Sequence, residues 1–182
     1  HLVQAFVRWM SPILSFTAQE AWPLIPEQSE KYVFTAEWYD IPVPSTANLI
    51  SEADWQTLIT VKSAVNKQIE TARNAKLIGS NLSAKVELWA NAELKTVLDQ
   101  FADELRFVLI TSTVIVKDFD AAQGEATDLD GLRVQVSAAE GEKCVRCWHV
   151  LPDVNTHSAH LGLCARCIIN LPSGQGEERK YA

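Results

Sequence analysis

The stretch EKCVRCWHV, from Glu142 to Val150, contains two of the four cysteines of the chain, and GLCARCI, from Gly162 to Ile168, contains the other two. Each stretch holds a C-x-x-C pair, and the sixteen residues 148–163 separate the pairs. Two such pairs at this separation are typical of a zinc site in which four sulfurs surround the metal as a tetrahedron. We therefore expect one zinc ion bound by Cys144, Cys147, Cys164 and Cys167.

Other uses of the four cysteines fit the sequence less well. Disulfides need an oxidising compartment, and no secretion signal opens the chain. A redox C-x-x-C motif ordinarily occurs once, at the start of a helix. Because four thiolates leave no open position for water, we expect a structural ion and not a catalytic one. We expect His149, His157 and His160 to lie on the surface, since the sulfurs already number four.

The cysteine region has few large apolar residues, so we expect it to be unfolded without the metal. Arg146 and Arg166 each lie between the two cysteines of a pair, and Trp148 directly follows the first pair. Guanidinium and indole groups on a rigid loop suit unpaired bases and phosphates, so these residues are candidates for RNA contact. Equally, Trp148 could fill the small core of the loop. For the two arginines, which could also be merely solvated, we favour RNA contact.

The composition of the 182 residues is that of a soluble globular protein, with 47% hydrophobic and 21% charged residues. No stretch approaches the apolar length that spans a bilayer, and we expect a cytoplasmic protein with no membrane partner. The net charge of −7 argues against a protein that binds nucleic acid over its whole surface. Acidic and basic residues balance from residue 139 onward, so this end is the better candidate for meeting a polyanion.

Residues 1–44 are expected to be helical and then extended. Apolar residues recur there at helical spacing with no helix cap before them: Leu2, Phe6, Trp9, Ile13 and Phe16. This opening predicts a carboxyl-terminal piece of a longer protein, with the apolar face of the first segment exposed.

Residues 45–138 predict a small α+β domain, with helices on one face of a mostly antiparallel sheet. Ser51 and Asp54 indicate the start of a long helix, and Gly79 is expected as its C′ residue. A strand is expected over 84–90, a helix over 92–107, and strands over 111–119 and 132–138. The aromatic residues expected in apolar cores are Trp9, Trp55 and Phe101. Residues 139–182 are expected to form a zinc-binding domain that ends in a flexible tail, LPSGQGEERKYA. The fold class is therefore α+β in several parts.

Three motifs, in this order, resemble a known family. SPILSFTAQEAW (residues 11–22) resembles the late-helix signature of the class I synthetase anticodon-binding bundle. VNKQIETARNAKLIGSNLSAKVELWA (residues 65–90) resembles the junction domain that follows that bundle. GEKCVRCWHV, LCARC and the closing GEERKYA resemble the terminal zinc peptide. Together they are similar to the carboxyl-terminal region of bacterial isoleucyl-tRNA synthetases, so residues 1–44 would be a remnant of the helical bundle.

The resemblance implies a tRNA-binding fragment of an enzyme that joins isoleucine to its tRNA with ATP. Its partners would be the anticodon arm of the isoleucine-specific tRNA and the upstream domains of the same chain, with ATP bound only in the parent protein. The HIGH and KMSKS signatures do not occur in this sequence, so no residue is assigned to catalysis. The resemblance places the zinc ligands on the same four cysteines. It also implies anticodon-side contacts by Arg146, Trp148, Arg166, Arg179 and Lys180.

Two alternatives remain open at this stage. The cysteine spacing also resembles the terminal finger of formamidopyrimidine-type DNA glycosylases, which flip a damaged base out of a duplex. The third possibility is a purely structural or protein-docking zinc module that contacts no nucleic acid.

Overall fold

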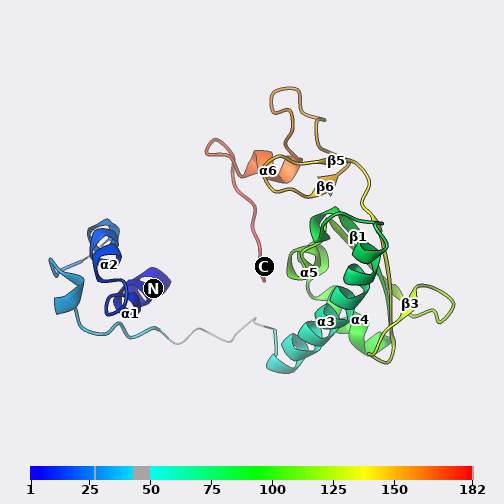
Figure 1. Cartoon of the computed structure of the whole chain (residues 1–182), viewed down its shortest axis with the longest axis horizontal. Coiled ribbons are helices and arrows are strands. Elements are labelled where there is room, and N and C mark those ends of the chain that lie inside the picture. Colours follow the sequence, from blue (N-terminus) through cyan, green and yellow to red (C-terminus); the bar gives the residue numbers. More distant parts are fainter. Residues whose placement is uncertain (27, 43–49, 182) are drawn as a thin grey trace. The chain divides into compact units, whose positions relative to one another are not determined.

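The computed structural model describes residues 1–26, 28–42 and 50–181, and the chain divides into two compact units (Figure 1). Unit 1 is His1–Leu49 and unit 2 is Ile50–Ala182. The cysteine region thus shares a unit with the α+β domain, while the predicted boundaries at residues 44 and 138 stay predictions. Within the described residues, none of the helices is long and apolar enough to cross a membrane.

Unit 1 contains two short helices, α1 (Leu2–Met10) and α2 (Ser15–Ala21), followed by single 3-10 turns at Trp22–Leu24 and Val33–Thr35. Its core is small and consists of Val7, Ala18, Trp22, Ile25 and Val33. The Trp22 indole donates a hydrogen bond to the Glu30 carbonyl (2.8 Å), and the Arg8 guanidinium lies over the same ring. Burial of one large aromatic side chain therefore organises this unit.

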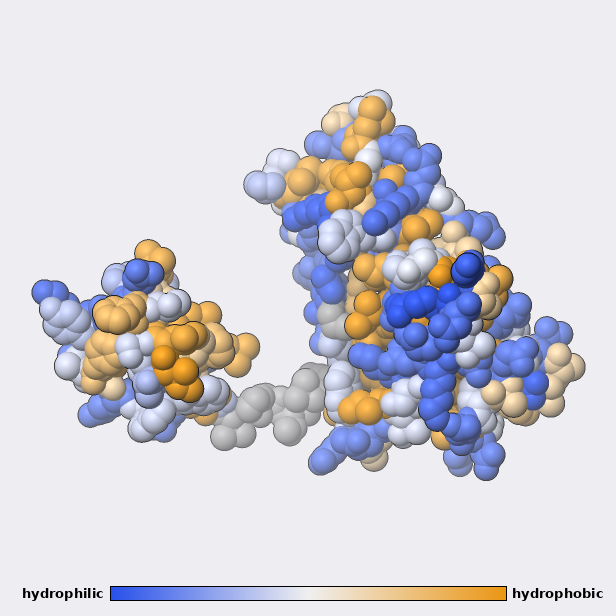
Figure 2. Space-filling model, in the orientation of Figure 1, coloured by the Kyte–Doolittle hydropathy of each residue, from blue (hydrophilic) through white to orange (hydrophobic). Residues whose placement is uncertain are grey.

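The apolar stripe of α1 faces away from that core. All five residues of the predicted helical repeat are exposed: Leu2, Phe6, Trp9, Ile13 and Phe16. Figure 2 shows apolar residues gathered on the visible face of this unit. The expectation of an exposed apolar face is confirmed, whereas the prediction that Trp9 is a core residue is wrong, because the buried residues of α1 are Ala5 and Val7.

Unit 2 begins with α3 (Glu52–Asn74). As predicted, Ser51 is its N-cap, and the Ser51 hydroxyl accepts a hydrogen bond from the amide of Asp54 (3.0 Å). The helix ends earlier than predicted. Lys76 adopts the left-handed conformation (φ 58°), and the amide of Leu77 closes the end by bonding to the carbonyl of Ala72 (3.0 Å). Lys76 thus takes the role predicted for Gly79.

The sheet of unit 2 has the strand order β2-β1-β4-β3. Its strands are β1 (Ala84–Ala90), β2 (Thr113–Asp118), β3 (Glu125–Ala126) and β4 (Leu132–Ala138). β4 pairs antiparallel with both β1 and β3, whereas β1 and β2 are parallel. The predicted mixture of helices and sheet is confirmed, and the sheet is partly antiparallel, with two antiparallel pairings and one parallel pairing. The parallel pair arises because the helices between β1 and β2 carry the chain back to the edge of the sheet where β1 begins, so that β2 can run in the same direction as β1.

That crossover is not the single helix predicted over 92–107. It consists of α4 (Ala92–Asp99), a 3-10 turn (Ala102–Glu104) and α5 (Leu105–Leu109). Ala102 adopts a positive φ of 42° at the break, next to Phe101, which is buried as predicted. Burial of this large ring offsets the backbone strain at the following residue.

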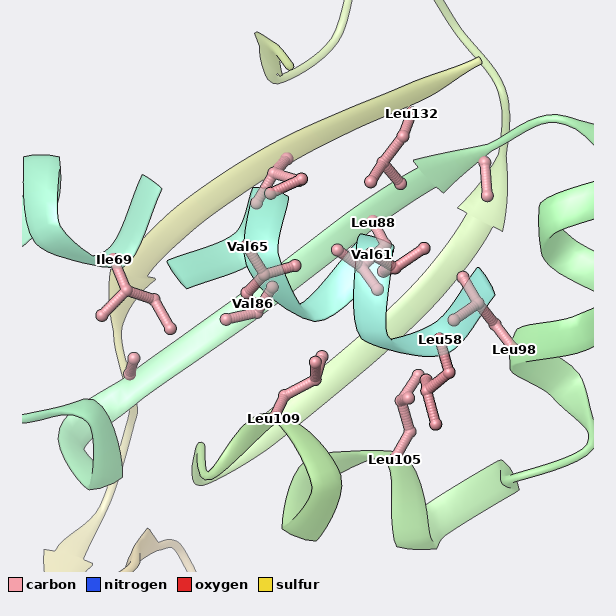
Figure 3. Close-up of a cluster of buried hydrophobic side chains, with 14 of the residues drawn as sticks. Leu58, Val61, Val65, Ile69, Val86, Leu88, Leu98, Leu105, Leu109 and Leu132 are labelled. Carbon is pink, nitrogen blue, oxygen red and sulfur yellow. The ribbon is translucent and has the colours of Figure 1, made fainter. Parts of the chain in front are cut away.

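The main core lies between α3, the sheet and the crossover helices (Figure 3). Leu58, Val61, Val65 and Ile69 of α3 point toward Val86 and Leu88 of β1, and Leu98, Leu105, Leu109 and Leu132 surround them. The prediction that Trp55 is a core residue is wrong, since its side chain is partly exposed at the start of α3.

The cysteine region contains a hairpin of β5 (Glu142–Lys143) and β6 (Val150–Leu151) and one short helix, α6 (Ala165–Ile169). It is joined to the α+β domain through Ser112, whose fully buried hydroxyl accepts a hydrogen bond from the amide of Val150 (2.7 Å). The last residues, for which a flexible tail was predicted, make hydrogen bonds with the rest of unit 2. They run from α6 back toward the α5 side of unit 2 (Figure 1), where the amides of Lys180 and Tyr181 donate to the carboxylate of Glu104.

Candidate metal centre

The first cysteine pair lies in the turn between β5 and β6. The amide of Cys144 donates to the carbonyl of His149 (2.9 Å), and the amide of Trp148 donates to the carbonyl of Cys144 (2.9 Å). Trp148 adopts a positive φ of 66°, which reverses the chain directly after Cys147. This tight turn brings both thiols of the pair to the same side.

The second pair is placed by α6. Cys164 is the N-cap residue of this helix and Cys167 lies within it, one turn further on. The carboxylate of Asp153 accepts a hydrogen bond from the amide of Ala165 (2.7 Å), which caps the helix with a charged group. The two pairs are tied together by a hydrogen bond from the amide of Val145 to the carbonyl of Gly162 (3.0 Å).

The four thiols converge on one point. The sulfur atoms of Cys144, Cys147, Cys164 and Cys167 all lie within 4.8 Å of one another, and those of Cys147 and Cys164 are 3.7 Å apart. In a tetrahedral site with Zn–S bonds of about 2.3 Å, neighbouring sulfurs are separated by about 3.8 Å. The donor set and its spacing therefore fit a zinc ion.

The backbone around the thiols favours one of them as a thiolate. Burial by itself raises the pKa of Cys144, but the backbone amides of Cys147, Cys164 and Arg146 point at its sulfur and lower the pKa to about 6. Burial raises the pKa of Cys164 and of Cys167, and the crowding by neighbouring thiols adds to the rise at Cys167. Four neighbouring thiolates would repel one another without a metal. A divalent cation would offset this repulsion, because it stabilises all four thiolates together.

The predicted RNA-contact residues of the first pair lie on its surface. The side chain of Trp148 is 59% exposed, and the ammonium group of Lys143 lies 5.3 Å from the centre of its ring. Trp148 therefore does not fill a core here. Arg146 is also exposed, and its guanidinium donates to the carbonyls of Cys167 (2.9 Å) and Asn170 (3.1 Å). Arg146 thus joins the two cysteine pairs as well as facing solvent.

The predicted contact residues of the second pair and the tail take part in intramolecular contacts. Arg166 donates through Nε to both carboxylate oxygens of Glu177 (3.1 and 3.0 Å), and Arg179 donates to the same carboxylate (2.7 Å). The ammonium group of Lys180 lies 4.7 Å from the ring centre of Tyr181. RNA contact by Arg166, Arg179 and Lys180 stays a prediction.

Sequence reasoning misplaced one histidine. His149 is 7% exposed, and its ring meets that of Phe107 edge to face, with centroids 5.9 Å apart. Burial lowers the pKa of His149, and the nearby charges of Arg106 and Arg166 lower it further. The expectation that His149 lies on the surface is wrong because Phe107, from α5, covers it. As expected, the only cluster of candidate ligands among the described residues consists of the four cysteines.

The supporting roles of three acidic residues were not predicted. Asp153 caps α6, Glu177 pairs with two arginines, and Glu104 holds the tail. Asp153 and Glu104 belong to no motif, and Glu177 lies in the GEERKYA stretch, to which no intramolecular contact was assigned. Only the preference for an acidic residue at a helix start could have suggested Asp153. That preference concerns residues next to the helix, whereas Asp153 precedes Ala165 by 12 residues in the sequence.

Comparison with known families agrees with this geometry. Residues 141–169 match the family described as "Zinc finger found in FPG and IleRS", and residues 1–88 match the family described as "Anticodon-binding domain of tRNA ligase". Residues 1–88 thus resemble a tRNA-ligase anticodon-binding domain, and residues 141–169, the zinc finger, resemble a zinc-finger family and hold all four cysteines.

The similarity extends to whole sequences. The chain is 81% identical, over all of its 182 residues, to the isoleucine–tRNA ligase of Acinetobacter baylyi. It is 46% identical to the isoleucine–tRNA ligases of Actinobacillus pleuropneumoniae serotypes 5b and 7 over 185 aligned residues. The chain spans about a fifth of the length of these relatives. It is similar over its whole length to the carboxyl-terminal part of an isoleucine–tRNA ligase, and this confirms the resemblance read from the three sequence motifs.

Proposed function

We propose that this chain is the tRNA-binding end of an isoleucine–tRNA ligase. In this proposal it holds the anticodon arm of the isoleucine-specific tRNA while upstream domains carry out ATP-dependent aminoacylation. The observation that carries the proposal is the 81% identity to such a ligase over the whole chain. The match of residues 1–88 to an anticodon-binding domain supports the part assigned to this region.

The metal has a structural part in this proposal. One zinc ion is held by Cys144, Cys147, Cys164 and Cys167, whose sulfurs have the spacing of a tetrahedral site. Because all four positions are filled by thiolates, the ion supplies folding free energy and no reactive water. It fixes the turn that presents Trp148 and Arg146 to solvent.

Trp148 is the best-supported RNA contact of the zinc finger. Its indole is exposed on a turn that a metal would hold rigid, which suits stacking on an unpaired base of the anticodon loop. Stacking of this kind contributes about 1–3 kcal/mol per base. Arg146 lies two residues away and adds positive charge beside that surface.

A binding titration tests the proposal. The chain should bind the anticodon stem-loop of isoleucine-specific tRNA with an affinity that falls as salt rises. Trp148→Ala should weaken binding by roughly 5- to 150-fold. Leu161→Ala, which removes another exposed side chain from the same finger, is the matched control and should leave binding unchanged. Preference for a damaged DNA duplex over the RNA hairpin would favour the glycosylase alternative instead.

The second candidate is a structural zinc module without RNA contact. It draws support from Arg166 and Arg179, since both guanidinium groups lie against Phe107 and pair with Glu177 inside the unit. An RNA footprint that leaves residues 144–167 unprotected, combined with unchanged affinity of Trp148→Ala, would favour this candidate.

A further inference from the structure

The residues that follow α6 are bonded to the zinc finger at one end and to the α+β domain at the other. At the finger end, the amide of Gly176 donates to the carbonyl of Ile169 (2.8 Å), and the amide of Glu177 donates to the side chain of Asn170 (3.1 Å). Both acceptors belong to the end of α6. The segment therefore starts from a fixed point on the helix that carries Cys167.

At the other end, the segment is anchored on the crossover between β1 and β2. The amides of Lys180 and Tyr181 donate to the two oxygens of the Glu104 carboxylate, each at 2.6 Å. The ring of Tyr181 packs against that of Phe101, with centroids 5.3 Å apart. Two charge-assisted hydrogen bonds and an aromatic contact thus hold the last residues on the α+β domain.

Glu177 links these anchors through charge. The guanidinium groups of Arg166 and Arg179 lie over the same ring, that of Phe107 on α5, at 4.8 and 4.5 Å from its centre. The guanidinium of Arg106 also lies 4.7 Å from the centre of this ring, so three like charges repel there. The Glu177 carboxylate offsets part of the repulsion by pairing with Arg166 and Arg179. Side-chain exposures of 21% for Arg166 and 17% for Glu177 keep this pair largely away from solvent.

The position of Arg166 depends in turn on the cysteine site. Arg166 lies in α6 between Cys164 and Cys167. A helix of five residues is far too short to be stable alone, so its placement relies on the contacts of its two cysteines with the other pair. A metal that binds all four thiols would fix α6, and with it the guanidinium that Glu177 meets.

We propose that residues 176–181 form a metal-dependent strap, which docks on Glu104 and Phe101 when the four-cysteine site holds its metal and is released when the metal is lost. Glu177 is the positioning residue that couples the two events. This inference rests on the proposed zinc site and does not depend on RNA binding. When the metal is bound, the docked strap holds the zinc finger against α5, and when the metal is lost, the strap no longer holds it there.

Coupling of this kind is reciprocal, which makes the proposal testable from two sides. If zinc favours docking of the strap by some factor, docking must favour zinc binding by the same factor. Glu177→Gln should therefore both loosen the strap and weaken zinc binding. Glu178→Gln makes the same chemical change at the next, exposed residue and is the matched control.

The experiment is hydrogen exchange on the full chain, with bound zinc measured by elemental analysis in each sample. Removing zinc with a chelator should raise the exchange rates of the Lys180 and Tyr181 amides on the order of tenfold or more. Glu177→Gln in the presence of zinc should raise them in the same direction. A competition titration should then show zinc affinity lowered by a similar factor in Glu177→Gln and unchanged in Glu178→Gln.

Three results would count against the proposal, and each points to a different fault in it. If zinc binds but the exchange of Lys180 and Tyr181 is the same with and without it, the strap is not coupled to the metal, and the metal site stands. If the chain binds no zinc, the metal site itself is wrong and the coupling fails with it. Equal effects of Glu177→Gln and Glu178→Gln would also count against the strap, because they would reflect general loss of charge.

Discussion

The cap on α6 offers a sharp test of how the fold supports the metal site. Asp153 accepts a hydrogen bond of 2.7 Å from the amide of Ala165, the first residue of the helix that carries Cys167. Asp153→Ala removes a charged acceptor from a partly buried amide. Loss of such a bond costs about 1–2 kcal/mol.

This cost should appear in the zinc affinity. Metal binding and folding of a small four-cysteine site are one equilibrium, so free energy lost from the folded form is lost from zinc binding. A cost of about 1–2 kcal/mol corresponds to an affinity weakened roughly 5- to 30-fold. Asp153→Asn keeps an acceptor oxygen but loses the charge, and should weaken the affinity by a smaller factor.

A competition titration with a chromophoric zinc chelator measures these affinities. Glu140→Ala is the matched control, since it removes an exposed acid just before β5. The reasoning is refuted if Asp153→Ala binds zinc as tightly as the unchanged chain. It is refuted equally if Glu140→Ala weakens zinc binding by the same factor, because the effect would then be one of net charge.

Two further predictions concern the core and the thiols. Leu88→Ala should lower the free energy of unfolding of unit 2 by about 2.7–5 kcal/mol in urea, because Leu88 is fully buried. Leu77→Ala, at an exposed site, should change it by less than about 0.5 kcal/mol. Equal effects would contradict the core assignment. Zinc affinity should fall as the pH is lowered, because protons compete with zinc for the thiolates. The pKa values of Cys164 and Cys167 are raised, so protons compete for these two sulfurs already near neutral pH. The pKa of Cys144 is about 6, so protons compete for its sulfur only near and below pH 6. Titrations between about pH 5 and pH 8 measure this dependence, and an affinity independent of pH would contradict thiolate ligation.

The parts of unit 2 that follow from local patterns are predictable from its sequence. The alternation in AKVELWA predicts β1, and its bounds are those of the structure, Ala84–Ala90. Ser51 caps α3 as predicted because an N-cap needs only residues within one turn. The spacing of the two C-x-x-C pairs predicts the cysteine cluster, since the chemistry of the ligands limits where they can lie.

Features that depend on distant residues were not predictable in the same way. The helix expected over 92–107 breaks beside Phe101, because burial of that ring in the core outweighs the helical pattern. The end of the chain has the composition of a flexible tail, yet it docks on Glu104, which lies 76 residues earlier than Lys180. His149 is buried because α5 covers it, a contact that no local pattern encodes.

X-ray absorption spectroscopy at the zinc edge, on the purified chain with its metal content measured, tests the central claim most directly. We expect one zinc per chain, with four sulfur ligands at about 2.3 Å and no nitrogen or oxygen in the first shell. A metal-free chain whose residues 144–167 stay folded, or a zinc ion with a nitrogen ligand such as His149, would contradict the account.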